Sequence, residues 1–162
     1  MEPRTHRKTR RCNPPKHEGD LEDLIGIDSN VLTYALDPTF PEHSRAKKAV
    51  LSSDGWAVNS TVVHECYHTL VFRRKISPTD SKLKIVEFLK EPRTSFLNLT
   101  KNTSLFALDL AAKTSLGGRD SLIVGCYLHH GIPEIYSHDE DLVKLGKVSI
   151  RGKHTHIIDP IK

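Results

Sequence analysis

The chain has 162 residues, with 37% hydrophobic and 27% charged residues, which suits one compact domain with a core of its own. No apolar run approaches the roughly 20 residues that a membrane span needs, so we expect no contact with a membrane. The net charge of +4 is uneven: residues 1–17 carry six basic residues against one acid, and residues 18–162 sum to −1, which excludes a broadly basic body.

The first 22 residues are interpreted as a basic, disordered leader, and residues 23–162 as one folded domain. The leader lacks the apolar stretch of a signal peptide, so a cytoplasmic location is expected. Any general attraction to nucleic acid would come from this leader, although a solvated segment without function is an equal alternative. The three cysteines are far apart and form no metal-binding pair or disulfide framework, so core packing is the expected role of Cys66 and Cys126.

Short apolar runs alternate with amphipathic segments along the rest of the chain. In chain order we predict a strand at 24–27, helices at 29–37 and 42–52, a strand at 56–58, and a helix that Ser60 or Thr61 caps and that runs to about 75. A helix that begins at Pro78, a strand at 95–99, helices at 103–113 and 120–130, a strand at 134–137, a short helix within 138–145 and an edge strand at 156–159 are predicted to follow. Strands that alternate with helices indicate an α/β fold, a mostly parallel sheet covered by helices on both faces.

Acidic side chains fall where predicted strands give way to helices: Asp28, Glu65, Asp120, and Asp139 with Asp141 behind it. In a parallel sheet these positions share one edge, where ligands usually bind. Carboxylates gathered there would repel one another unless a divalent cation joined them, and Mg²⁺ or Mn²⁺ prefers oxygen ligands. Helix capping is the better explanation for any one of Asp28, Asp120 or Asp139 taken alone, but Glu65 lies past the cap position of its helix.

Three stretches resemble the motifs of PIN-domain nucleases, in the right order between about residues 25 and 142. IDSNVLTYAL is similar to the opening motif, an apolar strand followed by Asp, any residue, Asn and two hydrophobic residues. TVVHE resembles the second motif, a lone Glu on the helix after the second strand. RDSLIVGCYLHHGIPEIYSHDEDL resembles the third and fourth, an Asp that opens an apolar helix and then Ser-x-Asp-x-Asp after a short strand.

The resemblance implies a PIN-like three-layer α/β/α sandwich and a Mg²⁺- or Mn²⁺-dependent ribonuclease, and the chain length suggests the VapC-type toxins of toxin–antitoxin pairs. By position, the acidic quartet of the family would fall on Asp28, Glu65, Asp120 and Asp139. The metal ligands would be Asp28, Asp120 and Asp139; Asp141 would be an auxiliary ligand, and Asn30 and Ser137 would support the site by hydrogen bonds. RNA is the implied substrate, and a cognate antitoxin protein and a second copy of the chain are the implied partners.

The segment HECYH at residues 64–68 also matches H-E-x-x-H, a zinc-peptidase signature when it lies on a helix. A zinc peptidase would leave three of the four acids as coincidental helix caps, whereas the nuclease interpretation leaves only His64 and His68 without a role. The expected reaction is therefore hydrolysis of an RNA phosphodiester by metal-activated water. Two further alternatives stay open: RNA processing outside a toxin pair, and a PIN fold that binds RNA or a partner without cutting.

Overall fold

A computed structural model describes residues 21–162. The predicted leader lies outside these residues except for its last two positions, which begin a short 3₁₀ helix, Leu21–Asp23. No helix in residues 21–162 is long and apolar enough to cross a membrane.

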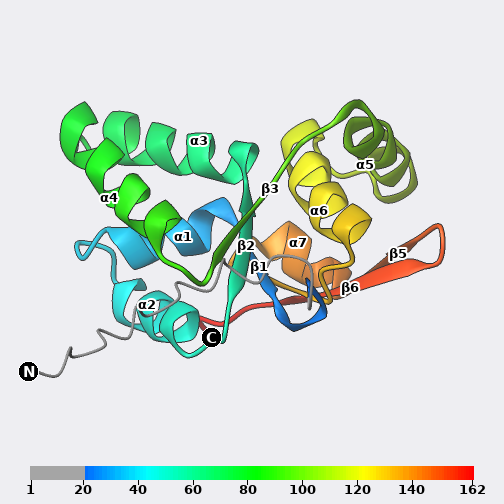
Figure 1. Cartoon of the computed structure of the whole chain (residues 1–162), viewed down its shortest axis with the longest axis horizontal. Coiled ribbons are helices and arrows are strands. Elements are labelled where there is room, and N and C mark those ends of the chain that lie inside the picture. Colours follow the sequence, from blue (N-terminus) through cyan, green and yellow to red (C-terminus); the bar gives the residue numbers. More distant parts are fainter. Residues whose placement is uncertain (1–20) are drawn as a thin grey trace, which may run out of the picture.

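The centre of the molecule is a six-stranded, mostly parallel sheet with the strand order β3-β2-β1-β4-β6-β5 (Figure 1). Its strands are β1 (Ile25–Ile27), β2 (Trp56–Asn59), β3 (Thr94–Leu97), β4 (Glu134–Tyr136), β5 (Lys147–Ile150) and β6 (Lys153–Ile158). Neighbouring strands are parallel except β5 and β6, which form an antiparallel hairpin. Strands β2 and β3, which follow β1 in the chain, lie on one side of it, and strands β5 and β6, which follow β4, lie on the other side of the sheet. The strand order therefore reverses between β1 and β4, and such a point is where α/β sheets usually bind ligands.

Helices cover both faces of the sheet, as the PIN-like three-layer prediction requires (Figure 1). One face carries α1 (Ser29–Leu36), α2 (His43–Leu51), α3 (Ser60–His68) with a π-helical turn (Thr69–Arg73), and α4 (Pro78–Lys90). The other carries α5 (Lys101–Thr114), α6 (Gly118–His130) and α7 (Glu140–Leu145).

Strand β1 is largely buried between these layers, and its Gly26 allows α6 to pack closely. A Cβ atom at Gly26 would lie 2.8 Å from the ring of Tyr127, whose hydroxyl donates a hydrogen bond to the Ile27 carbonyl at 2.6 Å. Cys66 and Cys126 are buried free thiols in the same core, and burial raises the pKa of each to about 12, as their predicted packing role requires.

Two local predictions were wrong. Helix α3 is capped by Asn59 rather than by Ser60 or Thr61, because the Asn59 side chain accepts from the backbone N–H groups of Thr61 and Val62. The segment predicted as an edge strand at 156–159 is part of β6, which lies inside the sheet because β5 pairs along its outer side.

Candidate active site

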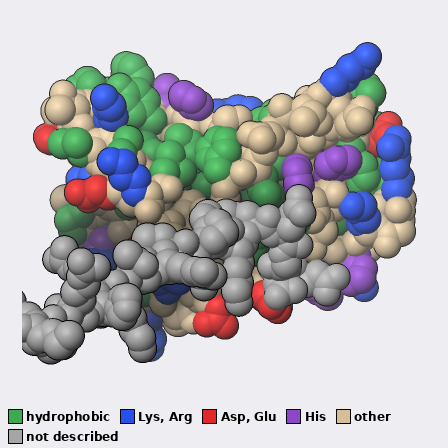
Figure 2. Space-filling view, in the orientation of Figure 1, with side chains coloured by type: hydrophobic (Ala, Val, Ile, Leu, Met, Phe, Trp, Pro, Cys, Tyr) green, Lys and Arg blue, Asp and Glu red, His purple; other side chains and the backbone are tan. Residues whose placement is uncertain are grey.

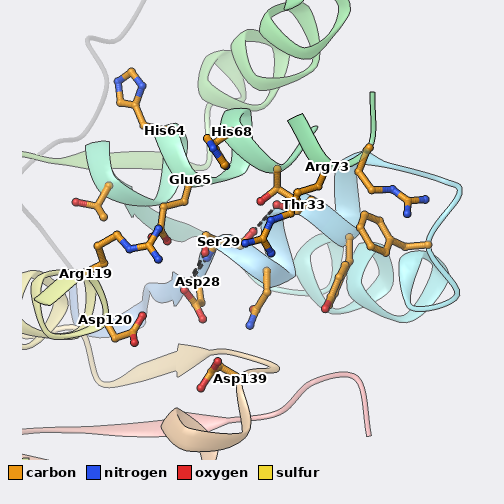
Figure 3. Close-up of a pocket in the computed structure, with 16 residues that line it drawn as sticks. Asp28, Ser29, Thr33, His64, Glu65, His68, Arg73, Arg119, Asp120 and Asp139 are labelled. Carbon is orange, nitrogen blue, oxygen red and sulfur yellow. Dashed lines mark hydrogen bonds and ion pairs between the residues drawn. The ribbon is translucent and has the colours of Figure 1, made fainter. Parts of the chain in front are cut away.

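The candidate active site is an open cleft of about 780 Å³ at the carboxyl ends of the parallel strands (Figure 3). Asp28 follows β1, Glu65 lies on α3, Asp120 is in the first turn of α6 and Asp139 follows β4. All four carboxylate residues line this one cleft. The fold thus brings together the acidic residues that the strand-end argument predicted to be neighbours.

Asp28 is the most buried of the four, with an exposed fraction of 4%. It is the N-cap of α1, where its Oδ1 accepts from the backbone N–H of Ser29 at 2.7 Å, and its Oδ2 accepts from the Ser137 hydroxyl at 2.6 Å. Burial raises the pKa of Asp28 to about 6; the nearby charges of Asp120 and Glu65 add to the rise, and the hydrogen bonds oppose it. A cation beside Asp28 would therefore stabilise the ionised form of its carboxylate.

Asn30 and Ser137 connect α1 to the loop after β4. The Asn30 Oδ1 accepts from the backbone N–H of His138 at 3.2 Å, and the Ser137 hydroxyl oxygen accepts from the backbone N–H of Asp139 at 3.1 Å. Both residues therefore hold this loop beside Asp28. Ser137 is fully buried behind the cleft, whereas Asn30 lines it.

Glu65 lies on the opposite wall of the cleft and forms an ion pair with Arg119. The Arg119 Nη1 is 3.0 Å from the Glu65 Oε1, and the Arg119 side chain is 79% exposed (Figure 3). Surface ion pairs with one partner this exposed are weak. The contact can therefore be exchanged for a substrate or a cation.

Asp120 and Asp139 complete the acidic end of the cleft. The pKa of Asp120 is raised, first by partial burial and then by the charges of Asp139 and Glu65. Asp139 is exposed and caps α7 by accepting from two backbone N–H groups. Asp141 does not line the cleft: its side chain is 86% exposed and lies 3.5 Å from the Lys144 ammonium.

The donor chemistry of this cleft fits a hard divalent cation. Carboxylate oxygens are the ligands that Mg²⁺ and Mn²⁺ prefer, and the charges of neighbouring acids add to the rise that burial causes in the pKa of Asp28 and Asp120. Within the part of the chain that the structure describes, no three His, Cys, Asp or Glu side chains are arranged to hold a metal ion as they stand. Binding would therefore require the carboxylates to draw together.

The two histidines of HECYH lie at the rim of the same cleft. Figure 3 shows His64 pointing away from the carboxylates and Glu65 pointing toward Arg119. His68 packs against the ring of Phe72, with 4.9 Å between the ring centroids. His64 thus points out of the cleft and His68 has an aromatic contact, whereas a zinc site of this motif needs both rings to face one metal ion.

The half of the cleft away from Asp120 carries side chains that sequence reasoning missed: Tyr34, Phe40, Arg73 and Arg74. Tyr34 could have been found from Asn30, because residues four apart share one face of a helix. The other three could not, since Phe40 lies in a loop and the two arginines follow an apolar segment in which only tertiary packing decides their direction.

The PIN domain family profile matches residues 25–148, which include every carboxylate described above. None of the curated protein sequences matches this chain significantly.

Three solved structures are similar in fold at low sequence identity. The crystal structure of Mycobacterium tuberculosis VapC20, described as a sarcin-ricin loop cleaving toxin, aligns with a TM-score of 0.66 and 17% identity over 78% of this chain and 98% of its own. VapBC2 from Rickettsia felis, bound to a DNA fragment from its promoter, has a TM-score of 0.60 and 12% identity over 84% and 98% of the two chains. A toxin–antitoxin complex from Klebsiella pneumoniae has a TM-score of 0.60 and 14% identity over 84% and 97%. With its fold, its family profile and its acidic cleft in agreement, the chain belongs to the PIN domain family.

Proposed function

We propose that this protein is a Mg²⁺- or Mn²⁺-dependent endoribonuclease and the toxin of a toxin–antitoxin pair. The observation that carries the proposal is Asp28, a buried carboxylate whose pKa is raised to about 6 at the floor of a cleft lined by three further acids. A burial this unfavourable is typical of a functional site. The buried negative charge of Asp28 is compensated only when a cation or a proton binds to the carboxylate during the reaction.

In this proposal Asp28, Asp120 and Asp139 would hold the divalent ion. When bound, the ion supplies a more acidic water and neutralises charge on the phosphate. The Ser137 hydroxyl orients the Asp28 carboxylate by its hydrogen bond to Oδ2. Arg119 would leave Glu65 and contact a phosphate oxygen at the mouth of the cleft.

The test is Asp28→Asn. Asn keeps the shape and the capping oxygen but loses the charge, so cleavage of a labelled RNA in Mn²⁺ should fall at least about 100-fold, because a metal supplies several kcal/mol of charge stabilisation. Asp54→Asn makes the same chemical change at an exposed position outside the cleft and should leave the rate unchanged. Full cleavage by a well-folded Asp28→Asn protein would refute the proposed metal site.

A cognate antitoxin is the proposed partner, and a homodimer the proposed assembly. Support for the antitoxin comes from two of the similar structures above, one described as a toxin–antitoxin complex and the other as VapBC2 bound to promoter DNA. A small DNA-binding protein encoded beside this chain, which binds it and stops cleavage, would establish the pair. Cleavage without such a neighbour would favour the second candidate, RNA processing outside a toxin pair.

A further inference from the structure

The cleft extends well past its carboxylates, along an aromatic wall formed by Tyr34 and Phe40. The two rings meet edge to face with 4.8 Å between their centroids, and the opposite side of Tyr34 lies 5.9 Å from the ring of His138. Both wall residues are half-buried, so each presents part of its ring to the cleft. Nothing in the proposed hydrolysis uses these rings.

The wall is held in place by a network around Arg74, at the end of the π-helical turn. The Arg74 Nε lies 3.1 Å from the Asp37 Oδ2, and its guanidinium lies over the Phe40 ring at 4.2 Å. Asp37 is almost fully buried, which opposes ionisation, yet hydrogen bonds from Thr39 and Arg74 hold its pKa below the usual value. The Asp37–Arg74 ion pair therefore holds the guanidinium over the Phe40 ring and fixes the position of that ring.

Arg73 faces the same part of the cleft because of the π-helical turn. An α-helix advances about 100° per residue, so residues eight apart drift roughly 80° around its axis. A π-helical turn has more residues per turn, which reverses part of this drift and returns Arg73 toward the face that carries Glu65 and Thr69. Among residues 21–162, Arg73 has no ion-pair partner, and its side chain is exposed.

We propose that this half of the cleft binds one unpaired nucleotide next to the cleaved phosphate, its base against Tyr34 and Phe40 and its phosphate on Arg73. The inference rests on the proposed function and adds to it a nucleotide subsite formed by these three side chains beside the carboxylates. A base inside a duplex is covered on both faces by its neighbours, so only an unstacked base can lie against the aromatic wall.

The test measures binding of the full chain in EDTA, where cleavage is absent, to three labelled probes. They are an unpaired 8-nucleotide RNA, the same RNA annealed to its complement, and the same RNA with one abasic ribose, moved along the strand in a series. The wild type should bind the unpaired RNA more tightly than the duplex. One position of the abasic series should weaken binding by about 5- to 100-fold, the size expected for one stacked base.

Phe40→Ala and Tyr34→Ala should each weaken binding of the unpaired RNA by a similar factor. Neither should change the binding of the abasic probe that already lacks the stacked base, and Tyr34→Phe should bind as the wild type does. Phe72→Ala is the matched control, because Phe72 is 58% exposed on the π-helical turn but does not line the cleft. Arg73→Gln should weaken binding of all three probes and, on the unpaired RNA, reduce the slope of log affinity against log salt by about 0.7.

Equal losses on the unpaired and abasic probes would give the rings a structural role only and overturn the inference. So would equal affinity for unpaired and duplex RNA, or no binding of any RNA probe, the result expected if the wall binds a protein segment. Cleavage in Mn²⁺ is measured separately. If the probes bind as expected but no RNA is cleaved, the proposed nuclease activity is refuted and the nucleotide site is kept. If RNA is cleaved but the probes do not bind as expected, the nucleotide site is refuted and the nuclease activity is kept.

Discussion

At the scale of single residues, Asp28 shows how a site side chain works against the stability of its own fold. The carboxylate caps α1 and binds Ser137, yet burial still raises its pKa to about 6. The Asp28 carboxyl group therefore keeps its proton to a higher pH in the folded state than in the unfolded state. The stability that this proton provides is complete below the unfolded pKa near 3.8 and is lost as the pH rises through about 6.

Asp28→Asn should therefore stabilise the metal-free protein above pH 6. The shift of roughly two pKa units corresponds to about 3 kcal/mol at most, since one unit is about 1.4 kcal/mol. Urea unfolding in EDTA, followed by fluorescence of the buried Trp56, should show the gain at pH 8 and lose it near pH 4. Excess Mn²⁺ should stabilise the wild type alone. Equal unfolding midpoints of the two proteins at pH 8 would contradict the assignment of Asp28 as an electrostatically unfavourable group.

The histidines of HECYH separate the nuclease from the zinc peptidase. Replacing His64 and His68 together by Ala should leave RNA cleavage within a few-fold of wild type and lower stability slightly, through the lost contact with Phe72. Glu65→Gln should abolish cleavage. Zinc analysis and melting temperature are measured on each protein. Bound zinc in the wild type that the double variant loses, together with proteolysis and no RNA cleavage, would favour the peptidase.

Asp28, Asp120 and Asp139 could be predicted because each follows a strand or opens a helix, and parallel strands bring those positions to one edge. Glu65 could be predicted because it lies about one turn into the helix that follows β2. The Asp37–Arg74 ion pair could not be predicted, because the two residues are far apart in the sequence and each alone is typical of a surface residue. Asp141 fits the sequence motif by position, but its side chain faces Lys144 and solvent.

At the scale of elements, α5 packs tightly against α6, the helix that carries Asp120. Gly125 of α6 faces Ala107 of α5, and a Cβ atom there would lie 2.9 Å from both the Cα and the Cβ of Ala107. The backbone of α5 cannot move aside as a flexible side chain can. The contact therefore fixes where α6 runs, and with it the position of Asp120 at the edge of the cleft.

Gly125→Ala should lower the melting temperature, since overpacking costs about 1–3 kcal/mol and the gain in helix propensity is at most about 1 kcal/mol. Cleavage should fall with it, because α6 must shift. Gly118→Ala is the control: nothing lies within 4 Å of its Cβ position, so it should be neutral or slightly stabilising. A Gly125→Ala protein as stable as the control would show that the helices can separate without loss.

The strands and helices of the parallel core could be predicted from their apolar periodicity, whereas the β5–β6 hairpin and the π-helical turn could not. The hairpin turns at Arg151 and Gly152, both with positive φ, and Arg is an unusual residue for such a turn. The π-helical turn spans only five residues, which is too short a stretch for its changed number of residues per turn to leave a clear periodic signal in the sequence.

At the scale of the whole molecule, the excess of positive charge lies in one short stretch of the sequence, residues 1–17, and not in the rest of the chain. Residues 18–162 sum to −1. Figure 2 shows Lys and Arg scattered among acidic, apolar and neutral side chains on the described part of one face. The arginines of the cleft are local contacts, so long-range attraction to RNA has to come from residues 1–17, which carry +5.

Deleting residues 1–17 should therefore weaken nonspecific RNA binding without abolishing cleavage at the acidic cleft. Each lost phosphate contact reduces the slope of log affinity against log salt by about 0.7 for single strands, so six contacts would reduce it by about 4. A full-length variant with the six basic residues replaced by Gln is the matched control, because it removes charge and keeps chain length. Both proteins should show the same shallower slope and the wild-type cleavage rate at saturating RNA. If the truncated, neutralised and wild-type chains share one slope at matched salt concentrations, these basic residues contact no phosphate, and the cleft alone accounts for RNA affinity.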